Sequence, residues 1–426
     1  MNLAMALEMA AECHPQRIAI TSGDFKLSYE GLLGAARTAA AAVRESGCRF
    51  LGVLDVNSPA VPIALFAAAY AGVPYVPINY RLTKPELEEL IGRIAPAVLI
   101  SSESLVKPLA IPAGVQVITR EAFLHLALAS EVGTTPATGD PQDIAIQVFT
   151  SGTTGRPKAA VLRHEHLMSY ILGTVEFGAA AEEDAILIAV PPYHIAGISA
   201  VLSSSYAGRR MVQLTNFDAA TWLKLAREEN ITNAFLVPTM LSRIVDHLVQ
   251  TGETADVPTL RAIAYGGGKM SLSVIERAIQ LLPGVDFTNA YGLTETSSTI
   301  CLLDPEDHRA GVASDDPAVR RRLGSVGKPV PSVEIQVRGE AGQLLGAGES
   351  GDIFVRGGQV AGEYLELGSM LDADGWFPTR DRGHVDEFGY LYLEGRADDV
   401  IVRGGENISP GEIEDVLLGH PAVSDV

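Results

Sequence analysis

The sequence has 426 residues, 47% hydrophobic and 20% charged, which indicates a globular chain of two or more domains and excludes a disordered one. Its 32 basic and 52 acidic side chains give a formal charge of −20, which argues against a surface that binds nucleic acid. The cysteines Cys13, Cys48 and Cys301 show no paired spacing. We therefore expect neither a disulfide framework nor a zinc site, and a cytoplasmic location is favoured.

The segment from Pro59 to Ile78 carries no charge and is long enough to cross a bilayer. Prolines interrupt it at both ends, however, and divide it into a short helix and a short strand. We therefore expect a buried βαβ unit here and no transmembrane segment. Residues Met1 to Met9 lack basic side chains, so no signal peptide is expected either.

Apolar runs alternate with amphipathic segments from residue 50 onward. The first series predicts strands at 50–55, 73–78 and 97–100 and helices at 60–71 and 84–93, followed by a mixed connection over 104–140. The second series predicts strands at 144–149, 185–190, 211–214, 234–237, 261–265 and 285–290, with helices opening near Arg163 and Asp218 and spanning 239–249 and 271–282. This alternation predicts an α/β fold of two βαβ-type, parallel-sheet subdomains.

The pattern changes after about residue 303. A charged connector is expected over 304–322, and short alternating segments at 333–337, 351–355 and 390–393 predict a small antiparallel β subdomain. We therefore expect an N-terminal domain over residues 1–394, with the α/β subdomains at about 1–303 and the β subdomain at about 324–394. Residues 395–426 are expected to form a hinge and the start of a C-terminal α+β domain, because they fall short of the roughly 50 residues of a complete domain.

Residues 148–160 are a candidate anion-binding loop that follows a predicted strand. Glycines and hydroxyls there can turn donors toward an anion, and Lys158 adds a point charge. The order Gly-Thr-Thr-Gly-Arg-Pro-Lys-Ala from Gly152 does not fit a Walker loop. Residues 266–269 and 291–296 also follow predicted strands, and open α/β sheets bind ligands at the carboxyl ends of their strands. The three loops together predict a polyphosphate site.

The string Thr-Ser-Gly-Thr-Thr-Gly-Arg-Pro-Lys over 150–158 resembles the phosphate loop of the adenylate-forming superfamily, which includes acyl-CoA synthetases, luciferases and adenylation domains. Similar motifs follow at 291–296, 376–381, 395–399 and 404–408, so the resemblance runs from about residue 15 to the end. It is closest in pattern to fatty-acid or aryl-acid CoA ligases. The resemblance implies activation of a carboxylic acid, with ATP, Mg²⁺ and coenzyme A as cofactors or cosubstrate.

The resemblance also implies roles for charged and polar residues. Glu295 would hold Mg²⁺, Thr294 would contact phosphate, and Lys158 would clamp the leaving pyrophosphate. Asp381 would accept the ribose hydroxyls, and Arg396 would contact the nucleotide.

The remaining expected residues fall into three sets. The nucleotide-binding set is Thr150, Ser151, Gly152, Thr153, Thr154, Gly155, Lys158, Gly266, Gly267, Gly268, Ala290, Tyr291, Gly292, Thr294, Asp381 and Arg396. The expected substrate pocket is Tyr193, His194, Ile195, Val237, Tyr265 and Gly266. The expected hinge residue is Asp398. His194 has two readings, a gate near the substrate carboxylate, grouped with the catalytic residues, or a buried structural histidine.

Two features bear on the substrate and the site. Residues 195–198 are uncharged where amino-acid-activating relatives carry an aspartate, and an unpaired ammonium there would be poorly satisfied. We therefore expect an apolar carboxylic acid, a fatty acid ahead of an aryl acid. Arg380 stands where the superfamily usually has a glycine before the ribose aspartate, and Ala159 replaces a frequent glycine of the phosphate loop.

The resemblance further implies a C-terminal domain of about a hundred residues that carries a lysine for the α-phosphate. The sequence ends at Val426, before that position, so we expect nucleotide binding with slow chemistry from these residues. Two alternatives remain open: a ligase that loads the phosphopantetheine of an acyl-carrier protein, and a non-catalytic nucleotide-binding module. A homodimer is also left open.

Overall fold

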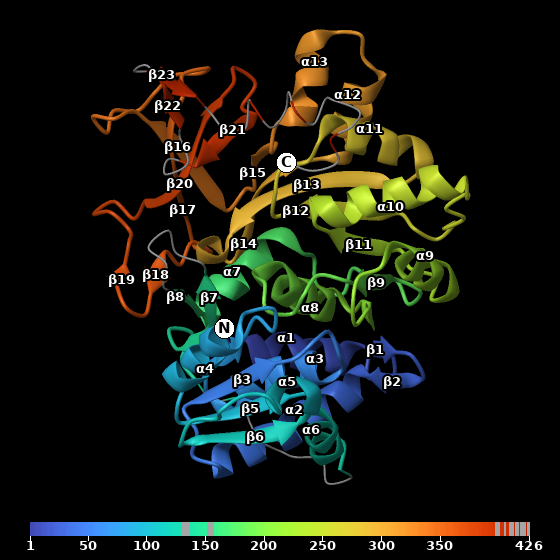
Figure 1. Cartoon of the computed structure of the whole chain (residues 1–426), viewed down its shortest axis with the longest axis vertical. Helices are drawn as coiled ribbons and strands as arrows, with labels where there is room; N and C mark the ends of the chain where they lie inside the picture. Colours follow the sequence, from blue (N-terminus) through green and yellow to red (C-terminus); the bar gives the residue numbers. More distant parts are fainter. Residues whose placement is uncertain are drawn as a thin grey trace.

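The computed structural model describes residues 1–129, 137, 139–150, 157–396, 401–403, 406–408, 413, 417 and 423. The expected phosphate-loop residues Ser151 to Gly155 and the expected hinge residue Asp398 lie outside these ranges. The strands form two large sheets and a small antiparallel one (Figure 1). We call these sheets 1, 2 and 3.

Sheet 1 carries most of the predicted strands of the second series. In spatial order it contains β15 (Lys328–Pro329), β14 (Ser298–Leu303), β13 (Asp286–Leu293), β12 (Ala262–Gly266), β11 (Asn233–Leu236), β9 (Ala185–Ile188), β10 (Arg210–Gln213), β1 (Ile18–Ser22) and β2 (Phe25–Ser28). The strands from β13 across to β1 are parallel. Their carboxyl ends therefore meet at one edge of the sheet.

Sheet 2 carries the first series and also the strand predicted at 144–149, which the sequence pattern places in the second series. In spatial order it contains β19 (Gly368–Ser369), β18 (Glu363–Tyr364), β8 (Lys158–Arg163), β7 (Ile144–Thr150), β4 (Tyr75–Pro77), β3 (Phe50–Leu54), β5 (Ala97–Ser101) and β6 (Val115–Thr119). The strands from β7 to β6 are parallel, and β8 runs antiparallel to β7. The residues that flank the expected phosphate loop are thus the end of β7 and the start of β8.

Sheet 3 is antiparallel throughout. It contains β16 (Val333–Arg338), β17 (Gly351–Gly357), β20 (Phe377–Val385) and β21 (Leu391–Arg396), and it lies at the upper left of Figure 1. Two further strands, β22 (Ile401–Arg403) and β23 (Glu406–Ile408), pair with each other. Parallel sheets with an added antiparallel sheet confirm the predicted fold class.

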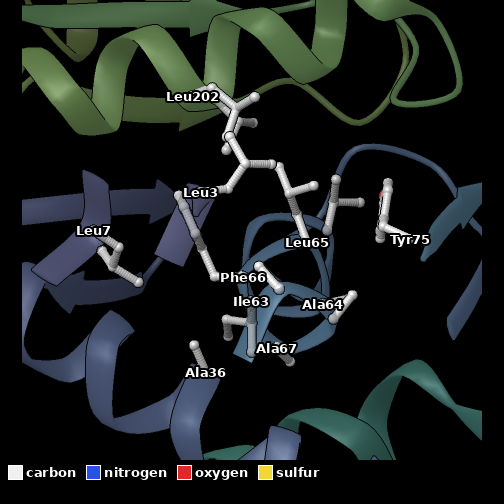
Figure 2. Close-up of a cluster of buried hydrophobic side chains, with 14 of the residues drawn as sticks. Leu3, Leu7, Ala36, Ile63, Ala64, Leu65, Phe66, Ala67, Tyr75 and Leu202 are labelled. Atoms are coloured by element: carbon white, nitrogen blue, oxygen red, sulfur yellow. The ribbon is translucent and has the colours of Figure 1, made fainter. Parts of the chain in front are cut away.

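Helices fill the space between sheets 1 and 2. These are α1 (Leu3–Cys13), α3 (Ala60–Ala71), α7 (His164–Thr174) and α8 (Ile195–Ala207), and α2 (Tyr29–Glu45) and α6 (Arg120–Ala127) extend the same core. Figure 2 shows Leu3 of α1, Leu65 and Phe66 of α3, and Leu202 of α8 meeting in this layer. The core also takes in Ile186 of β9 and Ile146 of β7, so one apolar layer joins the two sheets.

The uncharged segment that includes α3 is buried in this way. All residues of the helix from Ala60 to Tyr70 are buried, and a helix that is apolar on every side belongs in a protein interior or a bilayer. At 12 residues it is too short to cross a bilayer. Over the described part of the chain, no helix is both long and apolar enough to do so.

The outer faces of the sheets are covered separately. The helices α9 (Ala219–Glu228), α10 (Pro238–Thr251) and α11 (Leu272–Leu281) form a second core against sheet 1. On sheet 2, α4 (Lys84–Arg93) and residues of α5 (Glu103–Val106) pack over Leu54, Val76 and Leu99. The residues on these strands alternate between the two cores, as expected for sheets covered on both faces.

Several elements differ from the sequence expectation. The mixed connection over 104–140 contains α5, β6 and α6, and the charged connector forms α12 (Pro305–Ala313) and α13 (Pro317–Arg321). The strand β13 continues to Leu293, past the predicted end at 290, because its last residues pair with β14 in a hairpin. The two sheets are also interleaved in sequence, since β1 and β2 join sheet 1 whereas β18 and β19 join sheet 2.

Candidate functional site

The carboxyl edge of sheet 1 gathers the predicted loops. His194 follows β9, Val237 follows β11, Gly266 ends β12, and Thr294 follows β13. Because these strands are parallel neighbours, the four positions lie along one edge.

Sheet 2 contributes the flanks of the expected phosphate loop. Thr150 pairs with Lys158 across the β7–β8 ladder, so the loop between them begins and ends at the same place. Lys158 is half-buried, and its Nζ lies 5.8 Å from the ring centroid of Tyr364. The ammonium is thus directed over an aromatic face, which favours a cation.

Glu295 connects the two sheets. Its backbone carbonyl accepts hydrogen bonds from the N–H groups of Ala361 (2.9 Å) and Gly362 (3.1 Å). The Tyr364 hydroxyl donates to Glu295 Oε1 at 2.5 Å, and Tyr364 pairs with Ala160 of β8. Glu295 is 9% exposed. Lys158 and Glu295, from different sheets, therefore share Tyr364 as a neighbour.

Asp381 lies on the sheet 3 side of the same edge and is 7% exposed. The Tyr291 hydroxyl donates to its Oδ2 at 2.5 Å, and Arg396 Nε lies 3.6 Å from Oδ1. The backbone N–H of Asp381 donates to Thr379 Oγ1 at 3.1 Å. The carboxylate is thus held in place while keeping lone pairs for a ligand.

Burial has the largest effect on the pKa of the Asp381 carboxyl group. Desolvation raises the pKa of Asp381, and the Tyr291 hydrogen bond and the Arg396 cation oppose that rise. Burial also raises the pKa of both Tyr291 and Tyr364, and their carboxylate partners raise it further. Both hydroxyls therefore remain protonated and act as donors at neutral pH.

Arg380, which replaces the usual glycine, has φ of +66°. This left-handed conformation is readily adopted by glycine and is unfavourable for a residue with a Cβ. Strand β20 therefore keeps a glycine-type backbone at this position although its residue is arginine, and its pairing with β17 and β21 shifts register nearby. The Arg380 side chain is exposed.

Two predicted glycines are required by close backbone contacts. A Cβ on Gly266 would lie 2.0 Å from the carbonyl oxygen of Ala290 on β13, and one on Gly292 would lie 1.9 Å from that of Ser298 on β14. Gly267 has φ of +80°. The glycines thus allow β12, β13 and β14 to end close together, and Gly267 and Gly268 remain exposed at that edge.

The expected substrate pocket is bordered by aromatic side chains. The Tyr193 ring lies 4.5 Å from the His194 ring and meets Tyr80, which follows β4, edge to face at 5.2 Å. Desolvation, and then the Arg81 cation, lowers the pKa of His194, so it is neutral at pH 7. The residue is nevertheless exposed, which contradicts the alternative of a buried structural histidine, and it occupies the N-cap position of α8 without a side-chain capping hydrogen bond.

Asn57 links sheet 2 to sheet 1. Its buried side-chain amide donates to the carbonyls of Val190 and Leu214, each at 3.1 Å. The loop after β3 of sheet 2 is thereby tied to the loops after β9 and β10 of sheet 1. Ile195 and Val237 lie at the N-termini of α8 and α10, half-buried beside this contact region.

Tyr265 has a different placement. Its side chain is fully buried in the sheet 1 core, and its hydroxyl lies 2.8 Å from His308 Nε2. Alternation along β12 places Tyr265 on the same face of the sheet as Ile263, which packs in that core. The Tyr265 side chain is therefore part of the core of sheet 1.

Three residues at the site were not predicted: Tyr364, Tyr80 and Asn57. Tyr364 lies 69 positions from Glu295, and no local pattern brings it there. Tyr80 and Asn57 follow predicted strands of the first series, so the rule that ligands bind at strand ends could have identified them.

The site fits a magnesium–nucleotide complex. Glu295 offers a carboxylate whose Oε2 receives no hydrogen bond from the residues that the structure describes, and Thr294 offers a hydroxyl. No group of three His, Cys, Asp or Glu side chains suitable for a metal occurs among those same residues. Mg²⁺ is commonly held by one or two carboxylates together with substrate phosphates, so a single protein carboxylate is compatible with a bound magnesium–nucleotide complex.

Comparison with known proteins agrees with this arrangement. The AMP-binding enzyme family matches residues 7–365. Indoleacetate–CoA ligase of Aromatoleum aromaticum is 31% identical over 451 residues, covering 100% of this chain and 84% of the relative. The 2-succinylbenzoate–CoA ligase of Bacillus licheniformis is 32% identical, with 98% and 84% covered. The fatty acid–[acyl-carrier-protein] ligase ScoC of Streptomyces coeruleorubidus is 31% identical, with 100% and 82% covered.

A solved structure extends the likeness to the fold. The o-succinylbenzoate CoA synthetase (MenE) of Bacillus subtilis, in complex with the acyl-adenylate intermediate OSB-AMP, matches with a TM-score of 0.84 at 28% identity. The match covers 99% of this chain and 84% of that chain. The same enzyme has been solved in complex with ATP and magnesium ion.

Proposed function

The chain belongs to the AMP-binding enzyme family, and from this premise we propose that it joins a carboxylic acid to a thiol through an acyl-adenylate. The observation that carries the proposal is that Lys158 and Glu295 both contact Tyr364, while Asp381 binds Tyr291 on the strand that leads to Glu295. A cation, a metal-binding carboxylate and a hydroxyl acceptor are what the triphosphate and ribose of ATP need.

In the first half-reaction, a carboxylate oxygen of the acid attacks the α-phosphorus of ATP. The bond from that phosphorus to the bridging oxygen breaks, and pyrophosphate leaves with the bonding electrons. We propose that Lys158 holds the departing phosphates and that Asp381 fixes the ribose, which would keep the reacting atoms in line. Bound Mg²⁺ would neutralise phosphate charge. The loop residues Ser151, Gly152, Thr153, Thr154 and Gly155 remain a prediction for the same task.

In the second half-reaction, the sulfur of a thiol attacks the acyl carbonyl carbon and AMP leaves, while the thiol proton passes to solvent. We propose coenzyme A as the acceptor, as in the relatives named as CoA ligases. The likeness to ScoC supports a carrier-protein phosphopantetheine as the second candidate. Thioester formation assayed separately with coenzyme A and with a phosphopantetheinylated carrier protein distinguishes them.

We further propose that the acid is apolar and aromatic. The fatty-acid preference expected from the sequence rested on the uncharged residues 195–198, which do not distinguish an alkyl chain from a ring. Two of the three named relatives act, by name, on acids that contain an aromatic ring. The Tyr80, Tyr193 and His194 cluster adds edges and faces suited to an aromatic ring.

A panel of ATP–pyrophosphate exchange assays tests these proposals. Phenylacetate and benzoate stand for aromatic acids, octanoate and palmitate for fatty acids, and phenylalanine for amino acids. We expect exchange with an aromatic acid above that with a fatty acid, and none with phenylalanine, because no described side chain at 193–198 would pair its ammonium. Exchange with phenylalanine alone would contradict the proposed substrate class.

A further inference from the structure

The segment from Ala361 to Glu366 wraps around Glu295 on one side. Ala361 and Gly362 bind its backbone carbonyl, and Tyr364 binds its carboxylate at 2.5 Å. Both ends of this glutamate are therefore fixed by one short stretch of chain. The sequence motif at 291–296 gave no indication of that stretch.

On its other side, the same segment fastens the strand that leaves the expected phosphate loop. The N–H of Leu365 donates to the carbonyl of Ala159 at 2.9 Å, and the N–H of Ala159 donates to Glu366 Oε2 at 3.1 Å. Glu366 also pairs with Arg93, whose guanidinium donates to the carbonyl of Pro157 at 2.7 Å. Residues 157–159 are thus held against the segment that holds Glu295.

Tyr364 contacts both the glutamate and the strand that leaves the expected phosphate loop. Its hydroxyl bonds the Glu295 carboxylate, and its ring lies beneath the Lys158 ammonium at 5.8 Å from the centroid. A tyrosine hydroxyl that donates to one carboxylate oxygen fixes the plane of the carboxylate and leaves the other oxygen for a cation. A cation above a tyrosine face is likewise restricted in position.

We propose that Tyr364 is a positioning residue that sets the Glu295 carboxylate for the magnesium–nucleotide complex and holds Lys158 over the same phosphates. This inference rests on the proposed function. Tyr364 acts through two other side chains and contacts no reacting atom. The hydroxyl serves the metal side, and the ring serves the lysine side.

Two substitutions separate the tasks of the side chain. Tyr364→Phe removes the hydroxyl and keeps the ring, whereas Tyr364→Leu removes both. Tyr390→Phe is a matched control, because the Tyr390 hydroxyl donates to Asp307 Oδ1 at 2.6 Å and Lys328 Nζ lies 4.5 Å from its ring centroid. The control thus removes the same kind of bond, beneath the same kind of cation, at a contact between sheet 3 and α12.

The measurement is ATP binding by calorimetry, first with excess chelator and then over a series of Mg²⁺ concentrations. For Tyr364→Phe we expect unchanged ATP affinity in chelator. The Mg²⁺ concentration that gives half of the Mg²⁺-dependent increase in ATP affinity should rise roughly 10- to 100-fold. Tyr364→Leu should also weaken binding in chelator, and this further loss should disappear in a Lys158→Ala background. Tyr390→Phe should match the wild type in both conditions.

The outcomes distinguish the inference from the function beneath it. A wild type whose ATP binding does not respond to Mg²⁺ would refute the proposed function. A wild type that responds, with Tyr364→Phe indistinguishable from it, would refute the positioning role alone. Equal losses for Tyr364→Phe with and without Mg²⁺ would indicate a merely structural tyrosine and also overturn the inference. In a Glu295→Gln background, Tyr364→Phe should add nothing to the Mg²⁺ response, and an added shift there would contradict the role.

Discussion

Replacement of Asp381 by asparagine tests the ribose contact. The side chain is 7% exposed, and its acceptor Oδ2 receives the Tyr291 hydroxyl at 2.5 Å. Asparagine is close in shape and keeps one carbonyl oxygen for Tyr291. Because burial raises the pKa of Asp381, the native fold disfavours the charged form, and a neutral isostere should be tolerated. We therefore expect Asp381→Asn to fold with little change in stability.

The expected loss appears in nucleotide binding. A hydrogen bond to a charged group contributes about 1.5–3 kcal/mol, and asparagine can replace at most part of the carboxylate's capacity to accept two vicinal hydroxyls. At 1.4 kcal/mol per tenfold change, ATP affinity should fall roughly 10- to 100-fold. Arg396, at 3.6 Å from Oδ1, would lose its anionic partner in the same variant.

A comparison of ligands assigns this loss to the ribose. Calorimetry with ATP and with 2′,3′-dideoxy-ATP gives a cycle between protein and ligand changes. The wild type should prefer ATP over 2′,3′-dideoxy-ATP by roughly 10-fold or more, and Asp381→Asn should lose most of this preference. An Asp381→Asn variant that still prefers ATP to the same degree would refute the assignment.

The pH dependence of this preference follows from the raised pKa of Asp381. A carboxyl whose folded pKa lies above its unfolded value is disfavoured as an anion, so its contribution to stability is present at low pH and is lost as pH rises through the folded pKa. The anion that accepts both ribose hydroxyls is the form lost on acidification. As pH is lowered, the wild-type preference for ATP over 2′,3′-dideoxy-ATP should therefore begin to decline at a higher pH than it would with an aspartate of ordinary pKa. Any preference that Asp381→Asn retains should not change with pH.

The other predictions concern single side chains. Lys158→Gln should weaken ATP binding by roughly 10-fold or more and leave AMP binding nearly unchanged, as measured by calorimetry, because the ammonium is expected at the pyrophosphate side; equal losses for the two nucleotides would contradict that position. In denaturant titrations the free energy of unfolding of Arg380→Gly should exceed that of Arg380→Ala by about 1 kcal/mol, because both remove the charge and only glycine relieves the φ of +66°; equal stabilities would show that the backbone of β20 is unstrained at this position. Tyr265→Phe should cost about 1–3 kcal/mol of stability by leaving buried His308 without its partner at 2.8 Å, with the KM for the acid unchanged; a raised KM would place that ring in the pocket.

The parts of the site that follow strand ends could be predicted from the sequence. Gly266 and Thr294 come directly after apolar runs, and the parallel pairing of β12 and β13 brings their ends together as the rule for open sheets requires. Asp381 was identified only by resemblance to a family motif. Side chains alternate between buried and more exposed positions along β20, and Asp381 falls on a buried position. Its carboxylate there contacts Tyr291 of sheet 1.

What the sequence could not provide depends on contacts between distant segments. Tyr364 reaches Glu295 because β18 joins the edge of sheet 2 beside β8, and a strand of two residues carries no periodicity. Similarly, β8 was missed because its alanines, Ala159 and Ala160, resemble the start of the following helix as much as a strand. The helices α12 and α13 did have a signal, since Asp304 and Asp316 each precede a proline and cap a helix.

The central claim is that Lys158, Glu295 and Asp381 surround one nucleotide. A crystal structure of the chain with ATP and Mg²⁺ tests it most directly. We expect the ribose hydroxyls on the Asp381 carboxylate and the triphosphate between Lys158 and Glu295, with the Tyr364 hydroxyl still on Glu295. A nucleotide bound elsewhere, or one whose ribose faces away from Asp381, would contradict it.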